Sequence, residues 1–170
     1  ADAVDLPLVV YNVPGRTGSN VEAATTLELA EHANVTAVKE ASGNLAQIAE
    51  IIRHKPASFS VLSGDDALTL AVMAEGGDGV VSVTSNMVPK LASRMVELYD
   101  EGDTDGARDL AHRLAPLTTA AFIESNPIPL KAALSMMSKA ANVLRLPLVP
   151  LGSAHERALR DALVAVGALS

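Results

Sequence analysis

The chain has 170 residues and a formal net charge of −7, and hydrophobic residues make up 49% of it. This length suits one domain or one large part of a domain. The net charge is negative, and the chain has no cluster of more than two neighbouring Lys or Arg residues. Both features argue against nucleic acid and anionic membrane surfaces as partners. The chain contains no cysteine, which excludes disulfides and thiolate metal sites, and no run of 18 apolar residues that could span a bilayer.

The start of the chain has neither a positive segment nor an apolar core of the signal-peptide type. We therefore expect a cytoplasmic protein. Aromatic residues make up only 2% of the chain, so the core must be built from Ala, Val, Leu and Ile. Such a core suits helices packed on a parallel sheet.

Short Val-rich runs predict buried strands. They do not alternate with polar residues, as expected for parallel strands that are covered on both faces. The predicted strands are Pro7–Asn12, Thr36–Lys39, Phe59–Leu62 and Gly79–Val83.

A helical pattern of apolar residues follows each predicted strand. Asn20 is the predicted N-cap of the first helix, and Pro56 ends the second after a basic last turn. The apolar positions are Ala23, Leu27 and Ala30; Leu45, Ile48 and Ile52; Ala67, Leu70, Ala71 and Ala74; and Leu91, Met95 and Leu98.

The remainder of the chain is predicted to be helical. Its last helix begins with an apparent capping box, Ser153 to Glu156. The apolar faces are Ala107, Leu110, Ala111 and Leu114; Leu130, Ala133, Leu134, Met137 and Ala141; and Leu159, Ala162, Leu163 and Val166.

The order βαβαβαβα predicts an α/β fold with a parallel sheet and right-handed crossovers. A closed eight-stranded barrel needs roughly 250 residues. Periodicity alone therefore leaves two architectures open, an open four-stranded sheet or half of a barrel with a helical tail. The expected division is residues 1–102 for the βα units and 103–170 for the helical region.

Lys39 is the first candidate for chemistry because it ends the second predicted strand. The carboxyl ends of parallel strands form the edge at which such folds keep their sites. Burial favours a neutral amine, and a neutral amine attacks a ketone to form an imine. On position alone, a strand-end lysine that simply reaches solvent is the more common case.

Tyr11 and Arg16 lie at the same predicted edge. Tyr11 ends the first strand, where its phenol could relay protons, although a packed tyrosine is the more common case. Arg16 follows in the loop from Asn12 to Thr17, where a guanidinium could hold a carboxylate with two hydrogen bonds. An exposed loop arginine is an equally good interpretation.

Two glycine-containing segments have structural explanations. Ser63 to Asp66 predicts a tight βα turn with an N-cap, in which Gly64 also lets backbone approach a ligand. Glu75 to Gly79 precedes a strand, whereas phosphate-binding loops follow one, so we reject a nucleotide site. The histidines are dispersed and show no metal-ligand spacing.

Motifs along the chain together resemble the dihydrodipicolinate synthase family. The resemblance covers almost the whole chain and keeps the family's spacing between the tyrosine and the lysine. The motifs run in this order: Tyr11 to Thr17, Val38 to Gly43, Ser63 to Asp66, Gly79 to Thr84, Asn126 to Lys131 and Leu144 to Pro147.

This resemblance implies roles for individual residues. Lys39 matches the Schiff-base lysine, Tyr11 the proton-relaying tyrosine, and Arg16 the arginine that holds the carboxylate of the second substrate. Gly64 and Val81 match positions that line the pyruvate pocket. The implied enzyme is a lyase of the class I aldolase type that condenses pyruvate with aspartate 4-semialdehyde in lysine (diaminopimelate) biosynthesis. It uses no cofactor beyond the imine of Lys39.

The resemblance also implies a (β/α)8 TIM barrel of which this chain supplies the C-terminal half and the helical tail. In the family, earlier strands carry a threonine of the proton relay, the loop for the pyruvate carboxylate and a tyrosine lent across a dimer interface. We therefore expect a chain truncated at its N-terminus, inactive alone, and a homo-oligomer, either a dimer or a tetramer.

Other functions remain open from the sequence. N-acetylneuraminate lyase and 2-keto-3-deoxy sugar-acid aldolases would share Lys39 and Tyr11. Arg16 favours the synthase, because a sugar chain needs hydroxyl partners there in place of a cation. The alternative from another class is a non-catalytic assembly module, against which the presence of both Lys39 and Tyr11 argues.

Overall fold

The computed structural model describes residues 1–169 and divides them into two compact units. The first unit runs from Ala1 to Ser82, and the second begins at Val83. The sequence-based boundary at residue 102 followed the order of βα units, whereas this division follows packing. The boundary at 102 therefore stays a prediction.

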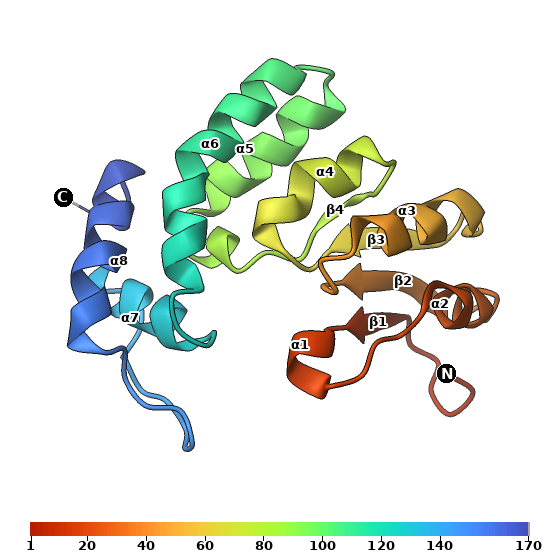
Figure 1. Cartoon of the computed structure of the whole chain (residues 1–170), viewed down its shortest axis with the longest axis horizontal. Coiled ribbons are helices and arrows are strands. Elements are labelled where there is room, and N and C mark those ends of the chain that lie inside the picture. The colour runs from red at the N-terminus through yellow and green to blue at the C-terminus, as the bar shows by residue number, and fades with distance from the viewer. Residues whose placement is uncertain (170) are drawn as a thin grey trace. The chain divides into compact units, whose positions relative to one another are not determined.

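The first unit is built on a four-stranded parallel sheet, as predicted. Its strands lie in the order β1-β2-β3-β4, so each strand pairs with its neighbours in the chain. Figure 1 shows that helices connect each strand of this unit to the next strand along the chain, as a parallel sheet requires. The strands are β1 (Leu8–Asn12), β2 (Val35–Glu40), β3 (Ser60–Ser63) and β4 (Gly79–Val80).

Helices connect these strands, and the best example of predicted boundaries is α3. The Asn44 side chain accepts a hydrogen bond from the Gln47 N–H at 3.2 Å, which caps the helix start. The helix ends at His54, just before Lys55 and Pro56. The helical segments are α1 (Pro14–Thr17), α2 (Ala23–Ala30), α3 (Leu45–His54), the 3-10 turn η1 (Asp66–Leu68) and α4 (Thr69–Ala74).

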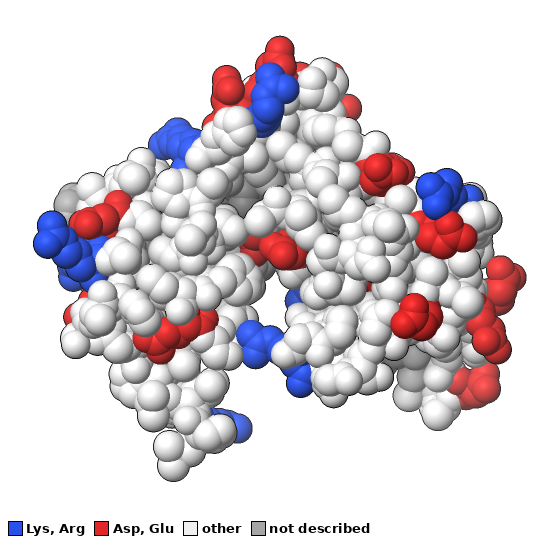
Figure 2. Space-filling model, in the orientation of Figure 1, with Lys and Arg blue, Asp and Glu red and all other residues white. Residues whose placement is uncertain are grey.

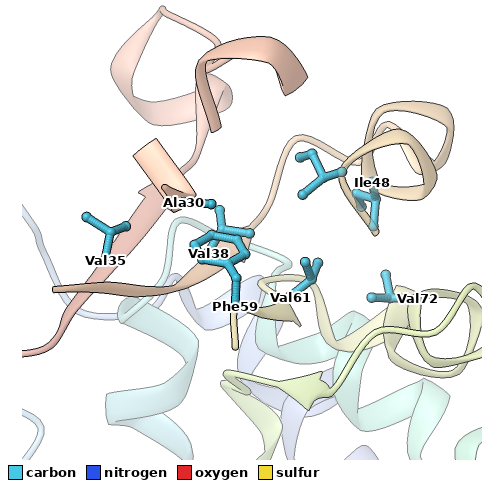
Figure 3. Close-up of a cluster of buried hydrophobic side chains, with 8 residues drawn as sticks. Ala30, Val35, Val38, Ile48, Phe59, Val61 and Val72 are labelled. Carbon is cyan, nitrogen blue, oxygen red and sulfur yellow. The ribbon is translucent and has the colours of Figure 1, made fainter. Parts of the chain in front are cut away.

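One cluster of apolar side chains forms the core of this unit. Val38 of β2 and Val61 of β3 face Ile48 of α3 and Val72 of α4, and all are at most 1% exposed (Figure 3). Phe59, which directly precedes β3, is also part of the cluster. The helices thus cover one face of the sheet, which fixes the direction of every alternate side chain along the strands.

Coverage of the strands differs from the prediction at β1. Val9 and Tyr11 are 53% and 47% exposed, whereas Val10 packs against the core cluster. The prediction that β1 is buried on both faces is therefore wrong. A run of apolar letters cannot distinguish one covered face from two when every residue is apolar.

The second unit consists of helices. In the core of this unit, Leu117 of α6 and Leu159 and Leu163 of α8 are fully buried, as is Ala133 of α7. Asp103 caps α6 by accepting a hydrogen bond from the Gly106 N–H at 2.9 Å. The segments are η2 (Thr84–Asn86), α5 (Pro89–Asp100), α6 (Thr104–Ala121), α7 (Ile128–Met136) and α8 (Ser153–Ala165).

Four local predictions are wrong. The helix α7 ends at Met136, so Met137 and Ala141 do not lie on its apolar face. Glu22, and not Asn20, occupies the N-cap of α2, and no side chain caps that helix. Gly152 occupies the N-cap of α8, so Ser153 is already helical and forms no capping box. The fourth strand ends at Val80 instead of Val83, because Val83 adopts helical dihedral angles at the start of η2.

Charge is divided unevenly along the chain. Residues 1–82 include eleven acidic and four basic residues, whereas residues 83–170 include nine of each. Figure 2 shows acidic side chains gathered over α2 and α3 of the first unit. Among residues 1–169, no helix has the length and apolar character that crossing a bilayer requires.

Candidate active site

Lys39 and Tyr11 are neighbours across the β1–β2 pair. They are directly opposite in the parallel register, near the carboxyl ends of both strands. The Lys39 Nζ lies 3.9 Å from the centroid of the Tyr11 ring, which is a cation–π contact. The two side chains point away from the helix-covered face, because Val38 and Val10 on either side belong to the core.

This pair has the parts that imine chemistry needs. Lys39 is half-buried and Tyr11 is exposed, so a small carbonyl compound can reach the amine. A phenol beside the amine can deliver or accept a proton as the imine forms. Within residues 1–169, the Tyr11 hydroxyl makes no hydrogen bond, which leaves it available to a substrate.

Arg16 lies a few residues beyond Tyr11. The predicted loop contains a one-turn helix, α1, which ends at Gly18 with a φ of 69°. Glycine suits this left-handed cap because it has no Cβ to clash. Arg16 is exposed, and no residue of α1 is buried.

Gly64 follows β3, where the backbones of neighbouring strands approach closely. Its N–H donates a hydrogen bond to the Glu40 carbonyl oxygen at 2.7 Å. A Cβ at this position would lie 2.6 Å from the Ala41 Cβ and 3.1 Å from the Glu40 carbonyl oxygen. Close packing of the two strand ends therefore explains the glycine without any ligand.

Val81 follows β4 and is 41% exposed. Its N–H donates to the Ser63 carbonyl oxygen at 2.8 Å, which continues the β3–β4 pairing beyond the strand. Lys39, Tyr11, Gly64 and Val81 thus lie at or just beyond the carboxyl edge of one parallel sheet. Substrates of barrel and open α/β enzymes bind at this edge.

Sequence reasoning missed a buried carboxylate beside this pair. Glu40 is 1% exposed and lies opposite Asn12 in the register. It accepts hydrogen bonds from Asn12 Nδ2 at 3.1 and 3.0 Å, from Gln47 Nε2 at 3.0 Å and from the Ser42 N–H at 2.7 Å. The only sequence signal was a charged residue directly after a predicted buried strand, and such a residue requires a partner if it is buried.

Asn20 belongs to the same network. Its Oδ1 accepts from Asn12 Nδ2 at 2.9 Å, and its Nδ2 donates to Gln47 Oε1 at 2.8 Å. This is why it does not cap α2. An asparagine before a helix resembles an N-cap in sequence, and only the fold shows that a longer-range partner takes its side chain.

No group of three or more potential metal ligands occurs among residues 1–169. A pocket of about 360 Å³ in the second unit includes Lys90, Arg113 and Lys139 in its lining. It contains none of the residues predicted for chemistry. The candidate site therefore rests on the strand ends of the first unit.

The sequence model of the dihydrodipicolinate synthetase family matches residues 1–166. The chain belongs to this family. It is 51% identical over 168 residues to the 4-hydroxy-tetrahydrodipicolinate synthase of Chlorobium limicola, with 98% of this chain and 57% of that protein covered. It is 50% identical over 169 residues to the same enzyme of Koribacter versatilis, with 99% and 56% covered.

Solved structures of the family also resemble the chain. Dihydrodipicolinate synthase from Thermotoga maritima matches with a TM-score of 0.96 and 41% identity, over 99% of this chain and 58% of that one. The chloride-inhibited enzyme from Acinetobacter baumannii, complexed with pyruvate, matches with a TM-score of 0.95 and 39% identity, over 99% and 58%.

The chain therefore spans a little over half the length of the curated relatives that it matches. Its four parallel strands and helices match part of the TIM barrel structures of dihydrodipicolinate synthases. This decides between the two architectures that periodicity left open, in favour of the barrel. The family assignment also agrees with the order of motifs along the sequence.

Proposed function

We propose that the protein carrying this chain condenses pyruvate with aspartate 4-semialdehyde to give 4-hydroxy-tetrahydrodipicolinate, through an imine at Lys39. The observation that carries the proposal is the contact between the Lys39 amine and the Tyr11 ring, 3.9 Å apart at the carboxyl edge of the sheet. Family membership and the pyruvate complex of the Acinetobacter baumannii relative give further support.

The proposed reaction begins at the Lys39 amine. Nζ adds to the ketone carbon of pyruvate, and the ketone oxygen leaves as water to give the imine. Loss of a proton from the methyl group gives an enamine, whose carbon then bonds to the aldehyde carbon of the second substrate. The aldehyde oxygen takes up a proton, and the substrate amino group displaces Nζ as the ring closes.

Tyr11 and Arg16 have separate roles in this proposal. The Tyr11 phenol moves protons to and from the imine intermediates, since its ring lies beside the amine and its hydroxyl makes no hydrogen bond within residues 1–169. The Arg16 guanidinium holds the carboxylate of aspartate 4-semialdehyde. Gly64 and Val81 line the part of the site that receives pyruvate.

Borohydride reduction in the presence of pyruvate tests the proposal directly. We expect a stable adduct on Lys39, located by peptide mass spectrometry, and no adduct in Lys39→Ala. Lys139→Ala is the matched control, because Lys139 is exposed and lies on the other unit. An adduct on another lysine, or none in the wild-type protein, would contradict the proposal.

The homo-oligomer, either a dimer or a tetramer, remains a prediction. One solved relative, with a TM-score of 0.96 and 42% identity, is described as a monomeric dihydrodipicolinate synthase variant. The family thus includes a form with a single subunit. Light scattering during size-exclusion chromatography measures the state of this protein, and a monomer would contradict the prediction.

A further inference from the structure

The loop that carries Arg16 contains a helix, α1, that contributes no buried residue. Residues 13–20 form this loop and connect β1 to the segment before α2. Apolar burial is what normally holds a surface segment in place. Hydrogen bonds where the loop begins and ends are therefore one means of holding Arg16 near the strand ends.

Asn12 joins the two ends of this loop. Its Nδ2 donates to Asn20 Oδ1 at 2.9 Å and to the Val21 carbonyl oxygen at 3.3 Å. Its Oδ1 accepts from the Val21 N–H at 3.0 Å. Asn12 is 1% exposed, so water does not compete for these bonds. The loop is closed at its base by one buried amide.

Glu40 holds that amide in place. Both carboxylate oxygens accept from Asn12 Nδ2, and Gln47 Nε2 and the Ser42 N–H supply further hydrogens. Every group that contacts the Glu40 carboxylate is a donor, which suits an acceptor-only carboxylate. If Glu40 were replaced by an uncharged residue with an N–H group, such as glutamine, that donor would face the donors that now bind the carboxylate.

Gln47 gives the loop a second attachment, to α3. Its Nε2 donates to Glu40 Oε2 at 3.0 Å and to the Val21 carbonyl oxygen at 3.1 Å. Its Oε1 accepts from Asn20 Nδ2 at 2.8 Å. The end of the loop is thus bonded to a helix as well as to a strand, and Glu40 contacts both anchoring amides.

We propose that Glu40 is a positioning residue whose buried carboxylate, through Asn12 and Gln47, fixes the Arg16 loop and thereby sets the selectivity for the second substrate. The proposal rests on the proposed function in its last part. Glu40 touches no substrate in this scheme, because it lies on the strand face opposite to Lys39. Its effect reaches the site through the placement of Arg16.

Glu40→Gln tests the proposal with little change of shape. We expect the KM for aspartate 4-semialdehyde to rise roughly tenfold or more, since small misplacements of a binding group cost up to about a hundredfold. Trapping of pyruvate at Lys39 should change less than about twofold. Glu50→Gln is the control, because Glu50 lies on α3 and, within residues 1–169, its carboxylate bonds only to Arg53 and His54.

Trypsin cleavage after Arg16 gives a readout that is independent of any activity. A loop released at its base should be cut roughly tenfold faster, because proteases select locally opened segments. The double variant Asn12→Asp, Glu40→Gln exchanges the carboxylate and the amide, which restores one donor–acceptor pair. It also removes the donor that Asn12 Nδ2 gives to Asn20 Oδ1 and to the Val21 carbonyl oxygen, so cleavage after Arg16 should stay fast.

Asn20→Ala serves if Glu40→Gln does not fold, because Asn20 is exposed and its removal leaves the core intact. The same pattern with smaller changes is expected. Unchanged cleavage after Arg16 would overturn the proposal, and so would equal losses in pyruvate trapping and semialdehyde use. A wild-type protein without an adduct at Lys39 would overturn the proposed function, and the cleavage rates would still decide the role of Glu40.

Discussion

Two adjacent residue pairs on the same two strands differ sharply in their surroundings. Tyr11 pairs with Lys39, and one residue further along Asn12 pairs with Glu40. The first pair faces away from the helices, and Tyr11 is 47% exposed. The second pair faces the helices, and each of its members is 1% exposed. Strand alternation alone places them on opposite faces.

The two pairs also differ in the number of their polar contacts. A single cation–π contact joins Lys39 to Tyr11, whereas the Glu40 carboxylate is satisfied by Asn12, Gln47 and Ser42 together. Groups that react must stay available to a substrate, and groups that hold them must be fully bonded because they are buried. Under the proposed function, chemistry takes place on one face and anchorage on the other.

The largest expected effect is a loss of turnover in Tyr11→Phe, which tests whether the exposed pair is the reactive one. We expect kcat to fall roughly 10²- to 10⁴-fold, the usual contribution of a positioned proton-transfer group. The unfolding free energy in urea should change by less than about 0.5 kcal/mol, because the hydroxyl makes no hydrogen bond within residues 1–169. Steady-state kinetics and urea titration measure the two quantities.

Tyr99→Phe is the matched control, since Tyr99 on α5 is the other tyrosine of the chain. It should leave kcat unchanged. A Tyr11→Phe variant with normal turnover would show that this tyrosine only packs over the lysine. A large loss of stability would remove the distinction between the two faces.

The placement of Lys39 and Tyr11 at one edge of the sheet could be predicted from the sequence, and the polar network around Glu40 could not. A lysine and a tyrosine at the ends of Val-rich runs indicate a site because parallel strands end at a common edge. The spacing of apolar residues gave α3 and its end at Pro56, and the buried face of α8. These features depend on local periodicity, which a single sequence carries.

The network around Glu40 depends on contacts that are remote in sequence. Asn12 and Glu40 are 28 residues apart, and Asn20 and Gln47 are 27 apart. Polar residues in loops and first turns have local uses as caps, so the sequence favours the local interpretation. For this reason Asn20 was expected to cap α2, whereas its side chain bonds to Asn12 and Gln47. Only the packing of β2 against α3 brings the distant partners together.

Gly64→Ala tests how closely the backbones at the strand ends beside Glu40 are packed. The added Cβ would lie within 3.1 Å of the Glu40 carbonyl oxygen and 2.6 Å of the Ala41 Cβ. We expect a loss of about 1–3 kcal/mol in unfolding free energy, the usual cost of overpacking a tight site. Urea unfolding measures it. Gly15→Ala is the control, because nothing lies within 4 Å of a Cβ at that position.

The same pair of variants separates two interpretations of Gly64. If the glycine serves only to admit pyruvate, Gly64→Ala will unfold like the wild-type protein and only pyruvate affinity will fall. If packing of the strand ends requires it, stability falls whether or not pyruvate is present. Equal unfolding curves for Gly64→Ala and Gly15→Ala would contradict the packing explanation.

The smallest expected effect concerns a carboxylate that is bonded but not deeply buried. Glu124 Oε1 accepts from His155 Nδ1 at 2.7 Å and from the Gly152 N–H at 2.9 Å, near the start of α8. The hydrogen bond from His155, followed by that from Gly152, lowers the pKa of Glu124 below its ordinary value of 4.5. Like Glu40, this carboxylate joins separate segments, but solvent screens its charge.

Glu124→Gln keeps the acceptor oxygen and removes the charge. Folding lowers the pKa of this carboxyl from its ordinary value of 4.5. The charged carboxylate therefore stabilises the protein at pH values above 4.5, and this contribution is lost as the pH falls through the lower pKa of the folded state. The variant should therefore be slightly less stable than the wild-type protein at about pH 7, and this deficit should be smaller at about pH 3. Urea titrations at both pH values, with Asp109→Asn on α6 as the control, measure the difference. A deficit of the same size at the lower pH would mean that the shape of the side chain, and not its charge, makes the contribution, and the contrast with buried Glu40 would then rest on packing.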